Sequence, residues 1–132
     1  MKVAIIRCDE HSNDCAGFSC FPSIMNKTGK FEDYETIEFV GFDTCGGCGR
    51  GKADKILARA TRLKEKGAEV IHMANCFAPC PSKELYETTL EKEVGVPIVK
   101  GTHPGPTPEQ MAAFRAAREA EEAKQAEEAA KA

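Results

Sequence analysis

With 132 residues, seven of them cysteine, and a formal net charge of −3, the chain is long enough for one domain that buries a core without disulfides. The charge gives no indication of nucleic acid or an anionic membrane as a partner, and no apolar run approaches the roughly 18 residues of a membrane span. The beginning, MKVAIIRCDEH, holds too short an apolar run for a signal peptide. We therefore expect a cytoplasmic protein, where clustered cysteines are more often metal ligands or redox thiols than structural bridges.

Short apolar runs alternate with helical patterns along the chain. We predict strands at residues 3–6, 36–42, 70–74 and 96–99 and helices at residues 20–27, 52–66 and 82–94. Pro97 cannot donate a hydrogen bond to a neighbouring strand, so the last strand is expected at an edge. This alternation predicts an α/β fold: a single three-layer domain with a four-stranded parallel sheet in the flavodoxin-like order 2-1-3-4.

The composition changes at the C-terminal end of the chain. Beyond Pro108 the sequence is rich in Ala and Glu, with Met111 and Phe114 as its bulky apolar groups. Such a segment forms a helix readily but has little surface to bury. We expect residues 1–107 to form the domain and residues 108–132 to form a C-terminal helix or tail, either solvated or docked on a partner.

The cysteines follow the ends of the predicted strands. Cys8 comes after the first strand, and Cys15 and Cys20 lie in the connection that leaves it. The later strands are followed by Cys45 and Cys48, by Cys76 and Cys80, and by His103. Because ligands of open parallel sheets bind beyond the carboxyl ends of the strands, we expect these side chains to meet at one edge.

Two pairs of cysteines have the spacing of metal ligands. Cys45-Gly46-Gly47-Cys48 lies at a strand-to-helix junction, where Gly46 and Gly47 permit positive φ and a close approach of the backbone to a cluster or ligand. Three residues separate Cys76 from Cys80, and Pro79 and Pro81 stiffen their loop. The two pairs supply four thiolates, the full set for zinc or for a 4Fe–4S cluster.

The identity of the metal stays open at this point. A closed zinc site uses four ligands and leaves three cysteines over, whereas one or more iron–sulfur clusters can use all seven. We therefore favour an iron–sulfur cluster, held for electron transfer, cluster carriage or redox sensing with a redox or cluster-transfer protein as partner. The alternatives are a zinc-binding domain and a metal-free dithiol oxidoreductase that uses Cys45 and Cys48.

These blocks resemble the CGGC domain family across residues 2–104. The resemblance rests on Arg7-Cys8, Cys15, Cys20, residues 40–48, residues 66–72, Cys76, Cys80 and residues 101–103. The family is identified mainly as a metal-binding domain of prokaryotes, on the basis of its cysteines and histidines. The resemblance thus implies that residues 1–107 are a CGGC-type metal-binding domain, and it implies no particular reaction.

Other functions fit fewer residues. The Cys-x-x-Cys resembles a thioredoxin active site, but the segment after Pro97 leads into the tail and not into the antiparallel hairpin of that fold. Residues 46–52 match the glycines and lysine of a phosphate loop, but Ala53 replaces the hydroxyl that binds magnesium. Among the histidines, we expect His72 to be a hydrogen-bonded core residue, and His103 is a better candidate than His11 for a ligand or proton donor.

Overall fold

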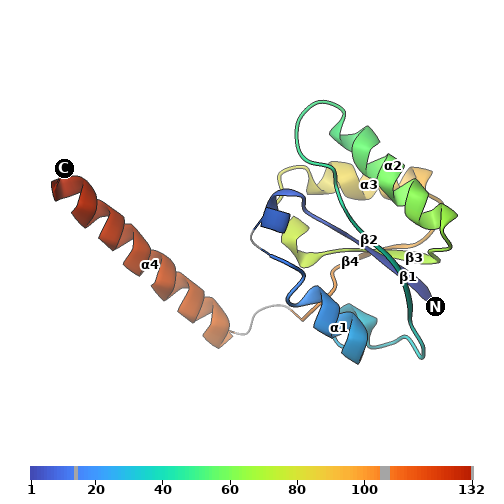
Figure 1. Ribbon diagram of the computed structural model, residues 1–132, viewed down its shortest axis with the longest axis horizontal. Coiled ribbons are helices and arrows are strands. Elements are labelled where there is room, and N and C mark those ends of the chain that lie inside the picture. Colours follow the sequence, from blue (N-terminus) through green and yellow to red (C-terminus); the bar gives the residue numbers. More distant parts are fainter. Residues whose placement is uncertain (14, 105–107, 132) are drawn as a thin grey trace.

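The sheet has the predicted topology. The computed structural model describes residues 1–13, 15–104 and 108–131, and the side chains of His11, Gln110, Met111 and Phe114 lie outside this description. The four strands are β1 (Lys2–Arg7), β2 (Glu38–Thr44), β3 (Val70–Met73) and β4 (Ile98–Lys100). They pair in parallel in the order β2-β1-β3-β4 (Figure 1). Both the flavodoxin-like order and the edge position of the strand after Pro97 are confirmed.

Helices cover both faces of the sheet. Helix α1 (Cys20–Asn26) lies on one face, and α2 (Lys52–Glu65) and α3 (Lys83–Glu93) lie together on the other (Figure 1). Short 3-10 helices η1 (Glu10–Asn13), η2 (Gly29–Phe31) and η3 (Asn75–Phe77) lie in the connections. The largest difference from the predicted bounds is at β2, which begins at residue 38 and not 36 and ends at residue 44 and not 42.

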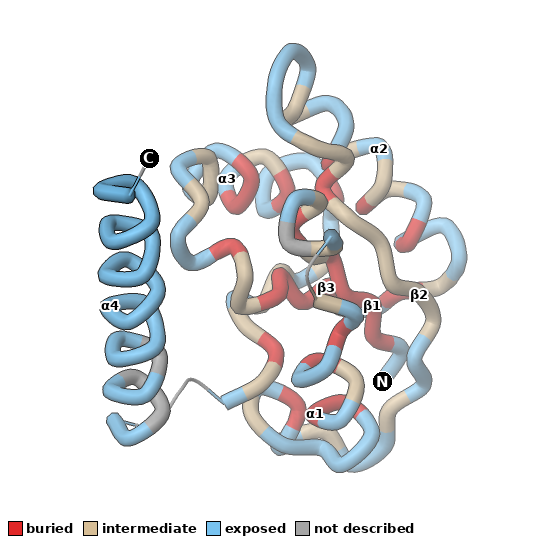
Figure 2. Tube along the Cα trace, turned by 60° about the vertical axis from the view of Figure 1, so that its left-hand side comes forward, coloured by how far each residue is buried: buried red, intermediate tan, exposed pale blue. Residues whose placement is uncertain are grey.

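The core explains why the central strands are apolar throughout. Successive side chains of a strand point to opposite faces, so Val3 and Ile5 pack on the α1 side, while Ala4 and Ile6 pack on the side of α2 and α3. Both faces are covered, and all four residues are fully buried (Figure 2). The core thus fixes the strand ends from which the cysteine loops depart.

His72 is a core residue, as the sequence predicts. It lies in β3 with no exposed surface, and its ring Nε2 is 2.7 Å from the Tyr34 hydroxyl. Its Nδ1 is 2.9 Å from the carbonyl oxygen of Gly101. A neutral ring that donates from Nδ1 and accepts at Nε2 satisfies both contacts, and burial, the main cause, lowers the pKa of the imidazole.

Burial of neutral His72 predicts a loss of stability as the pH falls. The unfolded chain takes up a proton below a pH of about 6.5 and the folded chain resists it, so stability falls by up to about 1.4 kcal/mol per pH unit below that value. We expect His72→Gln to destabilise the fold by about 1–3 kcal/mol at pH 7 and to reduce this slope. Tyr34→Phe keeps the buried ring and should keep the slope. Urea unfolding at pH 7, 6 and 5 measures both, and an equal slope in wild type and His72→Gln contradicts the assignment.

The C-terminal segment forms helix α4 (Pro108–Lys131), which lies apart from the α/β body in Figure 1. Its described side chains are exposed (Figure 2), and its contacts include an ion pair of 3.3 Å between Lys131 and Glu127 one turn away. No helix in the described part of the chain combines the length and hydropathy needed to cross a membrane. The helix is confirmed, and docking on a partner stays a prediction.

Candidate metal centre

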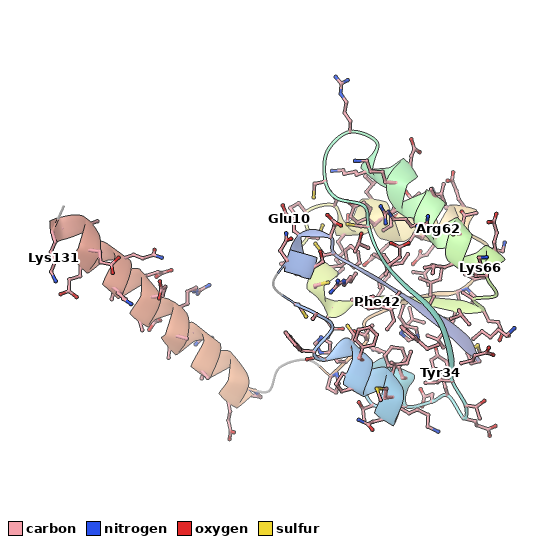
Figure 3. The ribbon with its side chains drawn as sticks, viewed as in Figure 1. Glu10, Tyr34, Phe42, Arg62, Lys66 and Lys131 are labelled. Carbon is pink, nitrogen blue, oxygen red and sulfur yellow. The ribbon has the colours of Figure 1, made fainter. Side chains whose placement is uncertain are left out.

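The cysteines lie at the carboxyl edge of the sheet. Backbone hydrogen bonds extend the strands there, from Cys45 N to Arg7 O at 2.9 Å and from Ala74 N to Ile6 O at 2.9 Å. Cys8 therefore lies beside the loops that carry the cysteines after β2 and β3, and sulfur atoms gather at the end of the body marked by Glu10 (Figure 3). All seven cysteines belong to the described residues and are free thiols.

Four of the thiols share one neighbourhood on the α2 and α3 side. We call Cys8, Cys45, Cys48 and Cys80 the four-thiol group. Cys8 and Cys45 are buried in the same core cluster as Tyr86, against which Cys80 also packs. Cys48 is exposed, and slight desolvation, Glu10 and the other three sulfurs of the group raise the pKa of its thiol. Neighbouring sulfurs raise the pKa of a thiol in this way because a second thiolate beside them is disfavoured.

Tyr86 of α3 lies at the buried side of this group. It has no exposed surface, and its ring meets Phe77 edge to face at a centroid distance of 5.8 Å. Its hydroxyl has no hydrogen-bond partner among the described residues. Burial, followed by the sulfurs of Cys45, Cys48 and Cys80, raises the pKa of the phenol. The hydroxyl therefore stays protonated at neutral pH and is a donor beside sulfur atoms.

Backbone amides point at two of the sulfur atoms. Asp9 N donates to Cys45 Sγ at 3.4 Å, and Cys8 N donates to Cys76 Sγ at 3.1 Å. The Asp9 carboxylate in turn accepts a hydrogen bond of 2.9 Å from the Thr44 hydroxyl. Amide donors of this kind stabilise negative charge on sulfur, as metal-bound thiolates require.

The glycine loop holds the backbone conformation that its sequence predicts. Gly46 and Gly47 have φ of +86° and +96°, a region that other residues rarely adopt. A Cβ at Gly46 would come within 2.8 Å of Arg59 Nε. The role of these glycines as cofactor contacts stays a prediction, but their backbone conformation requires glycine.

Asp43 anchors the start of the loop to α2. Its carboxylate receives Arg59 at 2.6 Å and Arg62 at 2.8 Å. Burial by itself would raise the pKa of Asp43, but the hydrogen bonds from Arg62, the Thr44 amide and Arg59 outweigh it and lower the pKa. Lys52, the lysine of the phosphate-loop pattern, donates to the Ser82 hydroxyl at 2.7 Å and so links the loop to the start of α3.

The other three cysteines lie toward α1. We call Cys15, Cys20 and Cys76 the pocket thiols, because all three line one cavity there. Cys20 Sγ is 3.2 Å from the Thr102 hydroxyl, and burial, the largest cause, raises the pKa of the Cys20 thiol. Burial also raises the pKa of Cys76 to about 11. The Cys20 and Cys76 thiols are therefore protonated at neutral pH.

The four sulfur donors of the four-thiol group are chemically suited to a thiophilic metal. Among the described residues, no three Cys, His, Asp or Glu side chains already have the arrangement that holds one metal ion. The four-thiol group nevertheless provides four sulfur donors, amide hydrogen bonds to sulfur and a buried phenol without a partner. Its outer member, Cys48, follows two glycines that permit the loop to turn. Metal binding would have to displace the thiol protons.

The histidines contribute little to the four-thiol group. His103 follows β4, where its Nδ1 is 2.9 Å from Pro104 O, and it lines the cavity of the pocket thiols. His72 is occupied in the core, and the side chain of His11 lies outside the described residues. The position of His103 at the carboxyl edge is confirmed, whereas its role as a ligand or proton donor stays a prediction.

Comparisons with known proteins agree with this description. The family model of the CGGC domain matches residues 2–103. An uncharacterized protein of Methanocaldococcus jannaschii is 44% identical over 115 residues, which cover 78% of this chain and 87% of that protein. No solved structure matches the chain.

Proposed function

The chain belongs to the CGGC domain family, and we propose that it binds a thiophilic metal centre, an iron–sulfur cluster in preference to zinc, through the four-thiol group. When bound, such a cluster supplies one-electron chemistry. Four thiolates from Cys8, Cys45, Cys48 and Cys80 are the complete ligand set of a 4Fe–4S cluster. The sequence predicts all seven cysteines as ligands, and we propose only these four. The sulfur of Cys76 lies next to them, since it accepts a hydrogen bond from Cys8 N.

The unpaired hydroxyl of Tyr86 is the observation that carries this proposal. A buried hydroxyl without a partner costs about 1–3 kcal/mol. Here it lies beside Cys45, Cys48 and Cys80, which become strong acceptors once they are thiolates bound to a metal. A metal centre held by these sulfurs gives the hydroxyl its missing partner.

The position of Cys48 favours a cluster that exchanges electrons or is itself transferred. Cys48 is exposed, while Cys8 and Cys45 are buried, so a centre held by all three lies just below the surface. Electron transfer and cluster transfer both require a partner protein to come close to the centre. Four sulfur donors suit zinc and a 4Fe–4S cluster equally, but the outer approach at Cys48 favours the cluster, because a closed zinc site neither exchanges electrons nor needs a partner protein close to it.

The dithiol alternative is less well supported by the described residues. An attacking cysteine works as a thiolate and is usually activated by a lowered pKa. Cys48 is the exposed member of the Cys45–Cys48 pair, and the pKa of its thiol is raised. The sheet is also entirely parallel, in contrast to the thioredoxin fold with its antiparallel hairpin.

Metal and sulfide analysis of the full chain, purified without oxygen, tests the proposal. We expect iron and acid-labile sulfide in equal amounts, with broad visible absorption that bleaches on reduction. Stoichiometric zinc without sulfide supports the zinc alternative. A chain that takes up neither iron nor zinc, as purified or after reconstitution, overturns the metal proposal, and reduction of a model disulfide then tests the dithiol enzyme.

We also propose that residues 1–107 form the metal-binding domain and that residues 108–132 are dispensable for it. The described side chains of α4 are exposed and add little to the core. A chain that ends at residue 107 should therefore keep its metal content and unfold within about 0.5 kcal/mol of the full chain in urea. A larger loss would show that α4 packs on the domain in solution.

A further inference from the structure

A second site lies on the α1 side of the sheet. A cavity of about 290 Å³ is lined by Arg7, Cys15, Cys20, Asn75, Cys76 and His103, among others. None of the four-thiol group lines it, so it is separate from the metal centre proposed above. Its residues come from the end of β1, the loop and start of α1, the segment after β3 and the segment after β4.

The cavity occupies the place where open α/β sheets bind ligands. In the order β2-β1-β3-β4, the connection from β1 runs to one side through α1, and β3 lies on the other side of β1. The strand ends of β1 and β3 thus form the switch point, beyond whose carboxyl edge ligands bind in such folds. Arg7 ends β1, and Asn75 and Cys76 follow β3, so both strands contribute to the wall.

Arg7 gives the cavity a fixed positive charge. One of its terminal nitrogens donates to the carbonyl oxygen of Cys15, and its guanidinium lies 4.9 Å from the ring centre of Phe42, which Figure 3 labels. Its Nε is buried without a hydrogen-bond partner, and no carboxylate of the described residues lies within ion-pair distance. An immobilised guanidinium that has a spare donor, and no counter-charge among the described residues, is suited to an anion.

The approach to the cavity is basic as well. An adjoining cavity of about 430 Å³ shares Ala74, Asn75 and His103 with the first, and Lys30, Lys83 and Lys100 line it. Among the described residues that line it, the one carboxylate is Glu87, which is already paired with Lys100 at 3.3 Å. The chain as a whole is acidic, with a net charge of −3, so the lining of this cavity is more positive than the average of the chain.

We propose that the cavity at the β1–β3 switch point binds a small organic acid, with Arg7 as the anchor of its carboxylate. The fork of the guanidinium matches a carboxylate. The cavity volume of about 290 Å³ lies just below the roughly 300–1,000 Å³ of typical small-molecule sites, so it suits a small acid better than a nucleotide. The thiols of Cys15, Cys20 and Cys76 line the part of the cavity that would hold the remainder of the bound acid. Asn75 holds the loop, because its side chain bonds both Thr102 N at 2.8 Å and His103 O at 2.9 Å.

Paired alkylation of the full chain tests this site. Iodoacetate and iodoacetamide alkylate a thiol by the same reaction: a sulfur–carbon bond forms at the CH₂ group, iodide leaves, and the thiol proton goes to solvent. The two reagents differ in that only iodoacetate carries a carboxylate. We expect the ratio of the two rates at Cys15, measured by mass spectrometry, to exceed the ratio for free N-acetylcysteine by roughly tenfold, which corresponds to one charge-assisted hydrogen bond. The iodoacetate rate should saturate, and acetate should protect Cys15 better than acetamide does.

Variants at Arg7 complete the test. In Arg7→Gln the rate ratio should fall to that of N-acetylcysteine, and Arg7→Lys should keep part of the preference. Arg50→Gln, which removes an exposed arginine from the glycine loop, should change nothing. An equal ratio at Cys15 and N-acetylcysteine overturns the proposal, as does protection by phosphate but not by acetate. If Arg7→Gln does not fold, saturation and the acetate–acetamide comparison in the wild type still decide. The outcome does not depend on whether the four-thiol group binds metal.

Discussion

Cys45→Ala is expected to remove most of the bound metal. Cys45 is 2% exposed, receives a hydrogen bond from Asp9 N and lies beside the Tyr86 hydroxyl. Four thiolates together contribute about 10–16 kcal/mol to a structural zinc site, so one of them corresponds to about 3 kcal/mol. This is roughly a hundredfold in affinity. Metal per chain, measured after gel filtration without oxygen, should fall to a small fraction of the wild-type value, and Cys48→Ala should behave in the same way.

Cys20→Ala is the matched control for this prediction. Cys20 is also buried, at 7% exposure, so both replacements delete a buried thiol at a comparable cost to the fold of about 1 kcal/mol. Cys20 differs in its position on the α1 side, where it contacts Thr102. The Cys20→Ala variant should therefore retain nearly all of the bound metal. Equal losses in Cys20→Ala and Cys45→Ala would show that the four-thiol group has been chosen wrongly.

The fold could be predicted from the sequence because each local signal agreed with the others. The apolar run at residues 3–6 indicates a strand that is buried on both faces, and alternation with helices fixes a parallel sheet. Pro97 places the last strand at an edge. The ends of β2 were harder to predict, because its first two residues are exposed, the other five are only partly buried and the apolar pattern is weak there.

The site could be predicted only in part. The rule that loops meet at the carboxyl edge is enough to bring the cysteines to one side of the sheet, but strand order does not tell which face of the sheet each loop occupies. The division into the four-thiol group and the pocket thiols therefore required coordinates. Arg7 and Tyr86 were missed as site residues, because one ends a strand and the other has the spacing of a core residue in its helix. A tyrosine among the apolar positions of α3 was the one available signal, since a buried hydroxyl needs a partner.

Tyr86→Phe should have opposite effects on the metal-free and metal-loaded protein. In the metal-free chain the hydroxyl is buried without a partner among the described residues, so its removal relieves an unpaired polar group. The ring keeps its edge contact with Phe77, and the fold should become more stable by about 1 kcal/mol. A phenol that is merely part of the core, with a hidden partner, would instead lose about 1 kcal/mol on replacement.

In the loaded protein the same replacement removes a hydrogen bond to a charged sulfur, an interaction of about 1.5–3 kcal/mol. Adding the gain of the metal-free state, we expect metal affinity to fall by roughly 50- to 1,000-fold. Competition with a chelator measures the affinity, and urea unfolding of the metal-free chain measures the stability. If the centre is an iron–sulfur cluster, loss of this donor should also lower its reduction potential, because hydrogen bonds to sulfur favour the reduced, more negative state.

Leu90→Ala is the control, because it deletes a fully buried side chain one turn further along α3. It should destabilise the metal-free and the metal-loaded protein by similar amounts and leave the metal affinity nearly unchanged. Opposite effects of Tyr86→Phe on the metal-free and the metal-loaded protein would therefore show that the hydroxyl acts on the metal-bound sulfurs.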